Sequence, residues 1–189
     1  LDERGLLVLA AKNDCPAERK GLRFRAVPGR AFLDDSMKAA AVILSPLGPV
    51  LLEETDGALT RLSFCGGSPY GKAPETPLLR EAAAELAAYF AGNRRQFSLP
   101  LAFPEGTPWE RLVWKTLLAI PYGETRTYAQ IAAMAGRPTA CRAVGAANRK
   151  NPLAVVVPCH RVIGKDGALT GYAGGLWRKK ALLKLEGAL

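Results

Sequence analysis

The sequence contains one histidine, no closely spaced cysteine pair and no long apolar run. Its 189 residues include four widely separated cysteines: Cys15, Cys65, Cys141 and Cys159. This spacing argues against a structural zinc site and against a disulfide scaffold, and it is typical of proteins of the reducing cytosol. No apolar run approaches the roughly 18 residues of a membrane span, and residues 6–11 are shorter than the hydrophobic region of a signal peptide. We therefore expect a cytoplasmic protein that does not enter a membrane.

Acidic residues are scarce in the C-terminal part of the chain. The formal net charge is +9, and residues 108–189 hold thirteen Lys or Arg but only four Asp or Glu, which accounts for the whole surplus. A local basic field of this kind attracts a polyanion such as nucleic acid. On charge alone, a basic surface kept for solubility is the alternative.

The N-terminal half changes character at residue 37. Residues 1–36 lack sustained periodicity and are interpreted as an extension upstream of the folded protein. Residues 39–44, 50–54 and 58–64 predict three strands, separated by turn sequences at 45–48 and 56–57. A Gly/Pro-rich loop at 66–77 precedes a predicted helix over 78–91, which Gly92 ends. Residues 37–100 are therefore predicted to form a small α+β scaffold domain, followed by a linker over 101–107.

Residues 108–189 are predicted to form a second, mostly helical domain. Two capping boxes, at 107–110 and 127–130, predict helices from 108 to about 120 and from 128 to Gly136. Pro138 and Thr139 predict the start of a third helix that reaches about residue 148. Two short helices joined at 136–138 resemble a helix-turn-helix, which is a weak signal by itself.

One face of the third predicted helix carries small side chains between two arginines. Arg142, Gly145, Ala146 and Arg149 share this face because they follow the helical spacing. A helix that reads the major groove normally displays Asn, Gln or several Arg, whereas small residues let backbones approach closely and suit the minor groove. Helix–helix packing through Gly145 and Ala146 is the alternative.

The chemically most informative motif is Cys159 followed by His160, the only histidine. The valine run 155–157 before Pro158 predicts a strand that the proline ends, with the thiol at the strand end facing a cleft. Only the thiolate is nucleophilic, and free cysteine has a pKa of about 8.5, so we expect the imidazole to lower the pKa of the thiol. A single histidine suggests chemistry without a full proton-relay triad.

At this point the sequence resembles a known family. Residues 158–162 (PCHRV), preceded by 142–145 (RAVG) and by Asn151-Pro152, closely resemble the O6-alkylguanine-DNA alkyltransferases. The resemblance continues through 171–175 (GYAGG) and a closing helix ending at 185–187, and it covers residues 37–189. It implies a ribonuclease-H-like N-terminal domain and a winged-helix-like second domain with a helix-turn-helix.

The implied activity is DNA repair by direct reversal. The alkyl group of O6-alkylguanine passes irreversibly to Cys159, one group per chain, as in methylated-DNA–protein-cysteine S-methyltransferases. O4-alkylthymine is a second candidate substrate. The implied partner is double-stranded DNA, bound by a monomer through the minor groove without sequence specificity. No cofactor and no metal is implied, because the zinc ligands of some animal members have no counterpart here. The physics agrees, since a buried guanine O6 must be flipped out of the duplex to react.

The resemblance also implies roles for individual residues. His160 deprotonates Cys159 through a water, and Glu186 orients the histidine. Asn151 braces the turn before the acceptor, and Tyr128 rotates a backbone phosphate and protonates the departing guanine. The DNA-binding positions are Arg142, which fills the gap left by the extruded nucleotide, with Ala143, Gly145 and Arg149. The pocket wall is formed by Val162, Tyr172 and Ala173.

Two readings concern the last helix. Glu186 lies near its C-terminus, where a negative charge opposes the helix dipole, so it is expected to pair with His160 unless it is a solvated surface residue. The basic residues Arg178, Lys179, Lys180 and Lys184 are expected to form a solvated face, with phosphate contacts as an added possibility.

Three other classes of function stay open on the sequence. A non-catalytic lesion-binding relative would replace the acceptor cysteine, so Cys159 argues against it. A Cys-His hydrolase would turn over, and it leaves the basic, small-residue helix unexplained. A helix-turn-helix regulator lacks base-reading side chains here.

Overall fold

The computed structural model describes residues 38–66 and 75–189. The interpretation of residues 1–36 as an extension, and most of the loop predicted at 66–77, lie outside these residues. All described residues belong to one unit, Asp35–Leu189.

Three strands form an antiparallel meander in the order β1-β2-β3: Lys38–Ser45, Gly48–Thr55 and Ala58–Phe64. The predicted strands and turns are confirmed. On β2, Val50 and Leu52 alternate with half-buried residues and mark the core face. A bulge between Glu53 and Glu54 shifts the register, so that Leu59 and Leu62 of β3 both face the core although three positions separate them.

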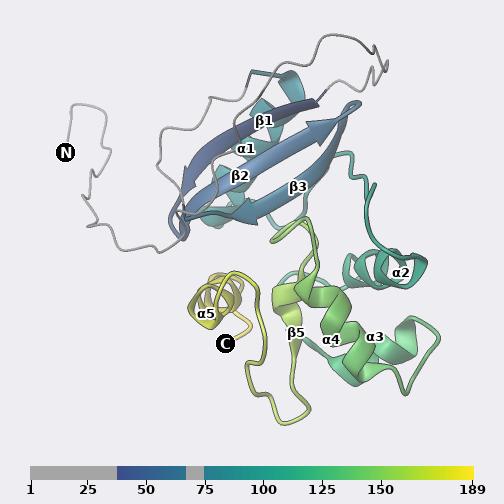
Figure 1. Cartoon of the computed structure of the whole chain (residues 1–189). Coiled ribbons are helices and arrows are strands. Elements are labelled where there is room, and N and C mark those ends of the chain that lie inside the picture. The colour runs from purple at the N-terminus through teal and green to yellow at the C-terminus, as the bar shows by residue number, and fades with distance from the viewer. Residues whose placement is uncertain (1–37, 67–74) are drawn as a thin grey trace, which may run out of the picture. The chain divides into compact units, whose positions relative to one another are not determined.

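Helix α1 (Pro77–Phe90) packs on this sheet (Figure 1). Thr76 caps it by accepting a hydrogen bond from the backbone N–H of Leu79, and its hydroxyl donates to Glu54 of β2 at 2.9 Å. The N-cap therefore ties the helix start to the sheet. The buried side of the helix includes Leu86 and Tyr89.

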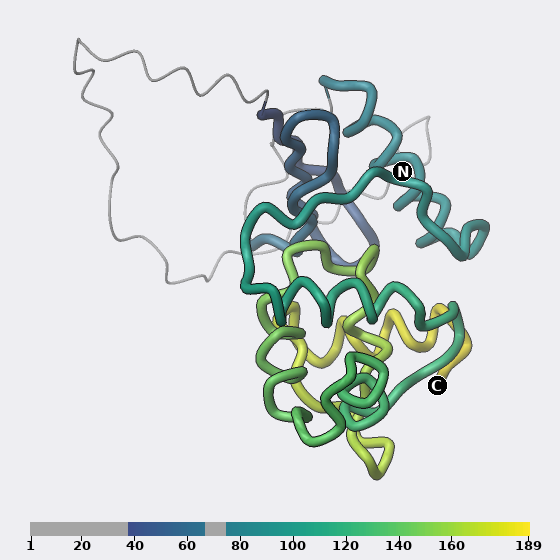
Figure 2. Tube along the Cα trace, turned by 90° about the vertical axis from the view of Figure 1, so that its right-hand side faces the viewer, coloured from purple at the N-terminus to yellow at the C-terminus, as the bar shows by residue number. Residues whose placement is uncertain are grey.

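The segment after α1, predicted as a linker, pairs with the sheet before it reaches the helical part. Leu101 forms a parallel bridge with Leu59, and the N–H of Leu59 donates to the carbonyl of Pro100 at 2.8 Å. Figures 1 and 2 show this segment crossing from the sheet to α2. The connection is therefore hydrogen-bonded to β3.

The helical part contains α2 (Pro108–Leu117), α3 (Tyr128–Met134), α4 (Cys141–Arg149) and α5 (Leu176–Leu185). Both predicted capping boxes are formed. The predicted start of the third helix is wrong by three residues. Pro138 and Thr139 lie in a turn closed by a hydrogen bond from the N–H of Ala140 to the carbonyl of Arg137, and α4 begins only after it, without a side-chain cap.

The valine run before Cys159 is not a strand, which corrects the prediction. Only Leu153 pairs with the sheet, in a single bridge to Leu62. The chain then turns: Val155 has φ 69°, and the N–H of Val157 donates to the carbonyl of Leu153 at 2.8 Å. Figures 1 and 2 show this loop reaching β3. The three valines are buried, and a run of β-branched residues indicates burial as much as it indicates a strand.

Cys159 consequently begins a short 3₁₀ turn, η1 (Cys159–Arg161), rather than following a strand. The next two residues form β5 (Val162–Ile163), which pairs in parallel with β4 (Arg126–Thr127). This two-residue pairing places the start of α3 next to the chain that leaves the acceptor turn.

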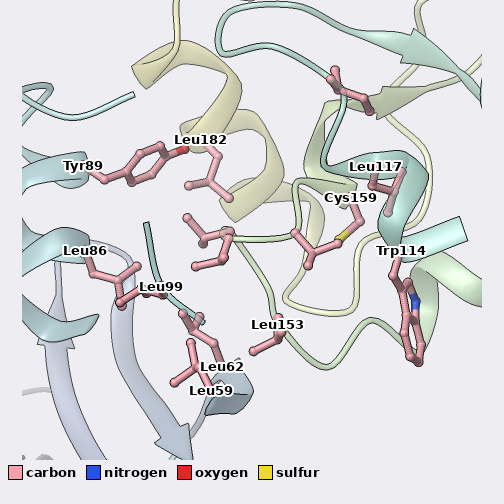
Figure 3. Close-up of a cluster of buried hydrophobic side chains, with 14 of the residues drawn as sticks. Leu59, Leu62, Leu86, Tyr89, Leu99, Trp114, Leu117, Leu153, Cys159 and Leu182 are labelled. Atoms are coloured by element: carbon pink, nitrogen blue, oxygen red, sulfur yellow. The ribbon is translucent and has the colours of Figure 1, made fainter. Parts of the chain in front are cut away.

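The core is continuous across the elements described above. Figure 3 shows leucines of β3, side chains of α1 and α2, Leu182 of α5 and Cys159 in one cluster. The predicted α+β class, a sheet followed by a mostly helical part, is confirmed. Within residues 38–66 and 75–189, no helix is both long and apolar enough to cross a membrane.

Candidate active site

A cavity of about 580 Å³ opens beside Cys159. Helices α3 and α4, turn η1 and the loop before α5 all contribute to its wall. It is lined by Cys159 and by six other predicted site residues: Tyr128, Arg142, Gly145, Arg149, Tyr172 and Ala173. The structure therefore brings the predicted acceptor, the predicted pocket wall and most of the predicted DNA-binding positions to one place.

The other predicted residues lie around this cavity. Ala143 is exposed on α4, one residue after Arg142. Val162 is fully buried, and its carbonyl takes part in the hydrogen bonds behind the wall. Asn151, His160 and Glu186 do not line the cavity. Asn151 contacts the sulfur of Cys159, and His160 and Glu186 are buried.

Asn151 is hydrogen-bonded to the acceptor turn at three points. Its Nδ2 donates to Sγ of Cys159 at 3.1 Å and to the carbonyl of Val157 at 2.9 Å. Its Oδ1 accepts from the N–H of Leu153 at 3.0 Å. One amide thus holds both ends of the irregular valine turn and one side of the sulfur.

Cys159 is only 7% exposed. Burial raises the pKa of this thiol, while the Asn151 hydrogen bond and the charge of Lys179 act in the opposite direction. The expectation that the neighbouring imidazole lowers the pKa is therefore wrong for the free protein. The imidazole is directed to Glu186 instead, and the sulfur rests as a thiol.

His160 and Glu186 form a buried pair. Nε2 of His160 lies 2.9 Å from Oε1 of Glu186, and Nδ1 has no hydrogen-bond partner in the described part of the chain. Burial lowers the pKa of His160. A neutral imidazole beside a carboxylate donates from Nε2, which leaves the Nδ1 lone pair free to accept a proton.

Glu186 also accepts from two further side chains and from the backbone N–H of Gly123 at 3.4 Å. Arg161 donates from Nε at 2.8 Å and from Nη2 at 2.9 Å, and the Tyr89 hydroxyl donates at 2.6 Å. Burial by itself raises the pKa of Glu186, but the hydrogen bonds from His160 and Arg161 outweigh it and lower the pKa to about 2. The alternative of a solvated Glu186 is excluded, since the residue is 5% exposed.

These pKa shifts predict acid sensitivity. Because the folded-state pKa of Glu186 is about 2, below its ordinary 4.5, its contribution to stability is complete above pH 4.5 and is lost as the pH falls toward 2. His160 adds to the loss, since the unfolded chain protonates it below its ordinary pKa of 6.5 while burial opposes protonation in the fold. We expect the melting temperature to fall progressively below pH 6.5 and most steeply below 4.5, measured by circular dichroism. A constant melting temperature between pH 7 and 3 contradicts this.

Comparison with known families decides the assignment. Residues 39–103 match the model of the 6-O-methylguanine DNA methyltransferase ribonuclease-like domain, and residues 108–188 match that of the DNA-binding domain of the same family. The chain belongs to the 6-O-methylguanine DNA methyltransferase family. The predicted family and the ribonuclease-like and DNA-binding fold are thereby confirmed.

Individual relatives of this methyltransferase family agree. The methylated-DNA–protein-cysteine methyltransferase of Methanosarcina barkeri is 52% identical over 150 residues, which cover 77% of this chain and 94% of the relative. The constitutive Bacillus subtilis enzyme of that name is 49% identical over 148 residues, covering 74% and 88%. A crystal structure of Mycobacterium tuberculosis O6-methylguanine methyltransferase matches with TM-score 0.71 and 45% identity, covering 80% and 94%. A structure of M. tuberculosis OGT in complex with DNA matches with TM-score 0.70 and 46% identity, covering 78% and 91%.

The methyltransferase site contains residues that the sequence analysis missed. Asn148 lines the cavity, and both its amide atoms are buried without a partner among the described residues. Arg161, Tyr89 and the backbone N–H of Gly123 also donate to Glu186. Tyr89 lies 97 positions before Glu186, so no local pattern could reveal that contact.

The expected solvated basic face of α5 is also wrong in part. Lys180 and Lys184 are exposed, but Lys179 is fully buried. Arg178 lies between the rings of Phe64 and Trp177 and donates to backbone carbonyls. The spacing of Lys179 with Leu182, Leu183 and Glu186 was the available signal, because these positions share one helical face.

Asn151→Ala is expected to destabilise the methyltransferase. The variant leaves the N–H of Leu153 without its partner in a buried turn and removes one of the two hydrogen bonds to the carbonyl of Val157, which costs about 1–3 kcal/mol. Urea unfolding measures the change, with Asn93→Ala, at an exposed position after α1, as the control. Equal stabilities of the two variants refute the bracing role.

Proposed function

We propose that this chain repairs O6-alkylguanine in double-stranded DNA by taking the alkyl group onto Cys159, once per molecule, after the nucleotide turns out of the duplex. Family membership gives the coarser statement, DNA repair by a methyltransferase. The finer proposal depends on one observation: of the described cysteines, only Cys159 lines the cavity, at the side of the helix that carries Arg142 and Arg149.

The proposed reaction needs one proton acceptor and one proton donor. Sγ of Cys159 attacks the alkyl carbon while the bond between that carbon and guanine O6 breaks, and the bonding electrons stay with the base. The thiol proton passes to Nδ1 of His160, directly or through a water, and the Tyr128 hydroxyl protonates the departing guanine. Transfer of a proton back from His160 to Tyr128 through solvent restores both groups. The net change is thiol plus alkylguanine to thioether plus guanine.

The buried pair suits this chemistry. The pKa of the thiol is raised, so the sulfur loses its proton during transfer rather than before it. The imidazolium that forms is stabilised by Glu186, which is ionised and already holds Nε2. A thioether offers no leaving group for a second step, which supports a single turnover.

The DNA surface is proposed to be α4. Arg142, Ala143, Ala146 and Arg149 are exposed on it, and Gly145 lies opposite Tyr128, where an added Cβ would be 3.7 Å from the ring. Such a helix with small side chains can approach the minor groove closely, and a flipped nucleotide leaves a gap that an arginine can fill. We propose that Arg142 fills this gap and that binding has no sequence preference. We also propose that the protein is a monomer in the cytoplasm.

Direct transfer is distinguished from excision by following the alkyl group. A duplex with one O6-methylguanine labelled in the methyl group should lose its label to the protein while the DNA strand stays intact. An unmethylated duplex is the control for adsorption. Label released as free base or as methanol, with unlabelled protein, rejects the proposal in favour of a glycosylase or a hydrolase.

Arg142→Ala is expected to slow repair in duplex DNA by about ten- to a hundredfold, because the extruded state loses a contact of about 1–3 kcal/mol. Reaction with free O6-benzylguanine, which needs no extrusion, should change less than twofold. The matched control is Lys115→Ala, which removes one exposed charge from α2. Equal losses on both substrates contradict the proposed insertion of Arg142.

A further inference from the structure

Glu186 receives a hydrogen bond from the N-terminal half of the chain. Tyr89 lies on α1, 97 positions before Glu186, and its hydroxyl donates to Oε1 of that carboxylate at 2.6 Å. Figure 3 shows the Tyr89 ring reaching from α1 toward the yellow helix α5. Tyr89 is fully buried, and its ring packs against three aromatic rings, those of Phe90, Phe97 and Tyr122. The packing of α1 therefore fixes the position of this hydroxyl.

Oε1 of Glu186 accepts from three donors in the described part of the chain. One is the Tyr89 hydroxyl, and the others are Nε2 of His160 and Nη2 of Arg161, each at 2.9 Å. Donors to one oxygen share its negative charge, so each of them makes that oxygen a weaker acceptor for the others. Glu186 also ends α5, where the free carbonyls of the last turn oppose a negative charge. Tyr89 therefore helps to keep the carboxylate ionised and weakens its attraction for a proton on His160.

The groups that face this pair come from α1, from η1 and from α5. Tyr89 stays a neutral donor, because burial and the charge of Glu186 both raise the pKa of its hydroxyl. The pKa of His160 is lowered by burial first, and then by the charges of Arg161 and Lys179. Among the described residues, Glu186 is the one that raises the pKa of His160. A contact that moderates this carboxylate therefore influences whether the imidazole is neutral.

The proposed reaction needs a neutral imidazole, because only a free Nδ1 lone pair can take the thiol proton. We propose that Tyr89 is a positioning residue of the site: its hydroxyl holds Oε1 of Glu186 against Nε2 of His160 and shares its charge, so that the imidazole stays neutral until the thiol proton arrives. The inference rests on the proposed function only in taking His160 as the proton acceptor. It gives α1, part of the predicted scaffold, a direct effect on the acceptor chemistry.

The first test uses the only histidine of the chain as a probe. The proton shift of Nε2–H of His160 is recorded by NMR at pH 7.5 in the untagged protein, in Tyr89→Phe and in the matched control Tyr122→Phe. The Tyr122 hydroxyl donates to the carbonyl of Leu185 at 3.0 Å, so the control removes a neighbouring hydroxyl that does not donate to Glu186.

We expect the Nε2–H proton of His160 to move downfield in Tyr89→Phe, because Oε1 has one donor fewer and accepts more strongly from the imidazole. Tyr122→Phe should keep the wild-type shift, even if it lowers the melting temperature. A folded Tyr89→Phe with the wild-type shift overturns the inference.

The second test is the pH profile of the reaction with free O6-benzylguanine, followed from pH 5.5 to 9. Without the Tyr89 hydroxyl the pKa of His160 should rise, so the acid limb of the profile should move upward by about half a pH unit to one unit. On that limb the rate at a given pH should fall about three- to tenfold, whereas at pH 8.5 it should stay within twofold of wild type. A profile that coincides with wild type, or a loss that is equal at every pH, overturns the inference. If both tests succeed while labelled methyl groups stay on the DNA, the proposed function fails and the coupling of Tyr89 to His160 stands.

Discussion

Cys159→Ser should abolish alkyl transfer from duplex DNA, with a loss of at least about a thousandfold, equivalent to about 4 kcal/mol on the barrier. A hydroxyl is far less acidic than a thiol and remains protonated beside a neutral imidazole. The buried position and the Asn151 hydrogen bond can accommodate an oxygen, so the fold should persist. Single-turnover loss of O6-methylguanine from the duplex measures the effect.

Cys141→Ser is the matched control. Cys141 is half-buried at the start of α4, and it does not line the cavity. This variant should transfer the alkyl group at the wild-type rate. Affinity of Cys159→Ser for methylated duplex should also stay within a few-fold of wild type, since the sulfur makes no proposed phosphate contact. Undiminished repair by Cys159→Ser would mean that another residue is the acceptor.

Glu186→Gln should be the most destabilising single change in the site. The carboxylate is the only acidic partner of Arg161 and His160 among the described residues, and removing one member of a buried ion pair costs about 3–5 kcal/mol. The amide also presents a donor toward Arg161 or Tyr89, which both need an acceptor. Chemical denaturation should show this loss, with transfer rates reduced in the remaining folded protein.

The control for Glu186→Gln is Glu124→Gln. Glu124 forms an exposed ion pair with Arg126 at 2.7 Å, and exposed pairs contribute about 0–1 kcal/mol. The two variants remove the same charge from the same half of the chain. If they unfold at the same denaturant concentration, the buried network does not stabilise the site as described.

Local signals in the sequence predicted local structure well. The turns at 45–48 and 56–57 and both capping boxes depend on neighbouring residues, and all are formed. The strand predicted over the valine run was wrong because the run indicates burial and not pairing. Of the neighbouring residues, only Leu153 pairs with a strand. The predicted start of α4 was wrong because the φ angle that proline fixes suits a turn as well as the first position of a helix.

The residues of the site were predicted mainly through the resemblance to the family. The pKa shifts and buried charges of the site were not predicted. The sequence places His160 beside Cys159, but it cannot show that the imidazole is directed to Glu186, 26 positions away. The burial that raises the pKa of the thiol, and the enclosure of Lys179, arise from packing of α5 on the acceptor turn. Such long-range contacts have no counterpart in residue spacing.

The most direct test of the central claim is the intact mass of the protein after incubation with an excess of duplex DNA carrying O6-methylguanine. The account predicts one added CH₂ unit per chain, located on Cys159 by peptide mapping, with repair ceasing when every chain carries it. Repair of many lesions per chain, or loss of the lesion with the protein mass unchanged, would contradict it.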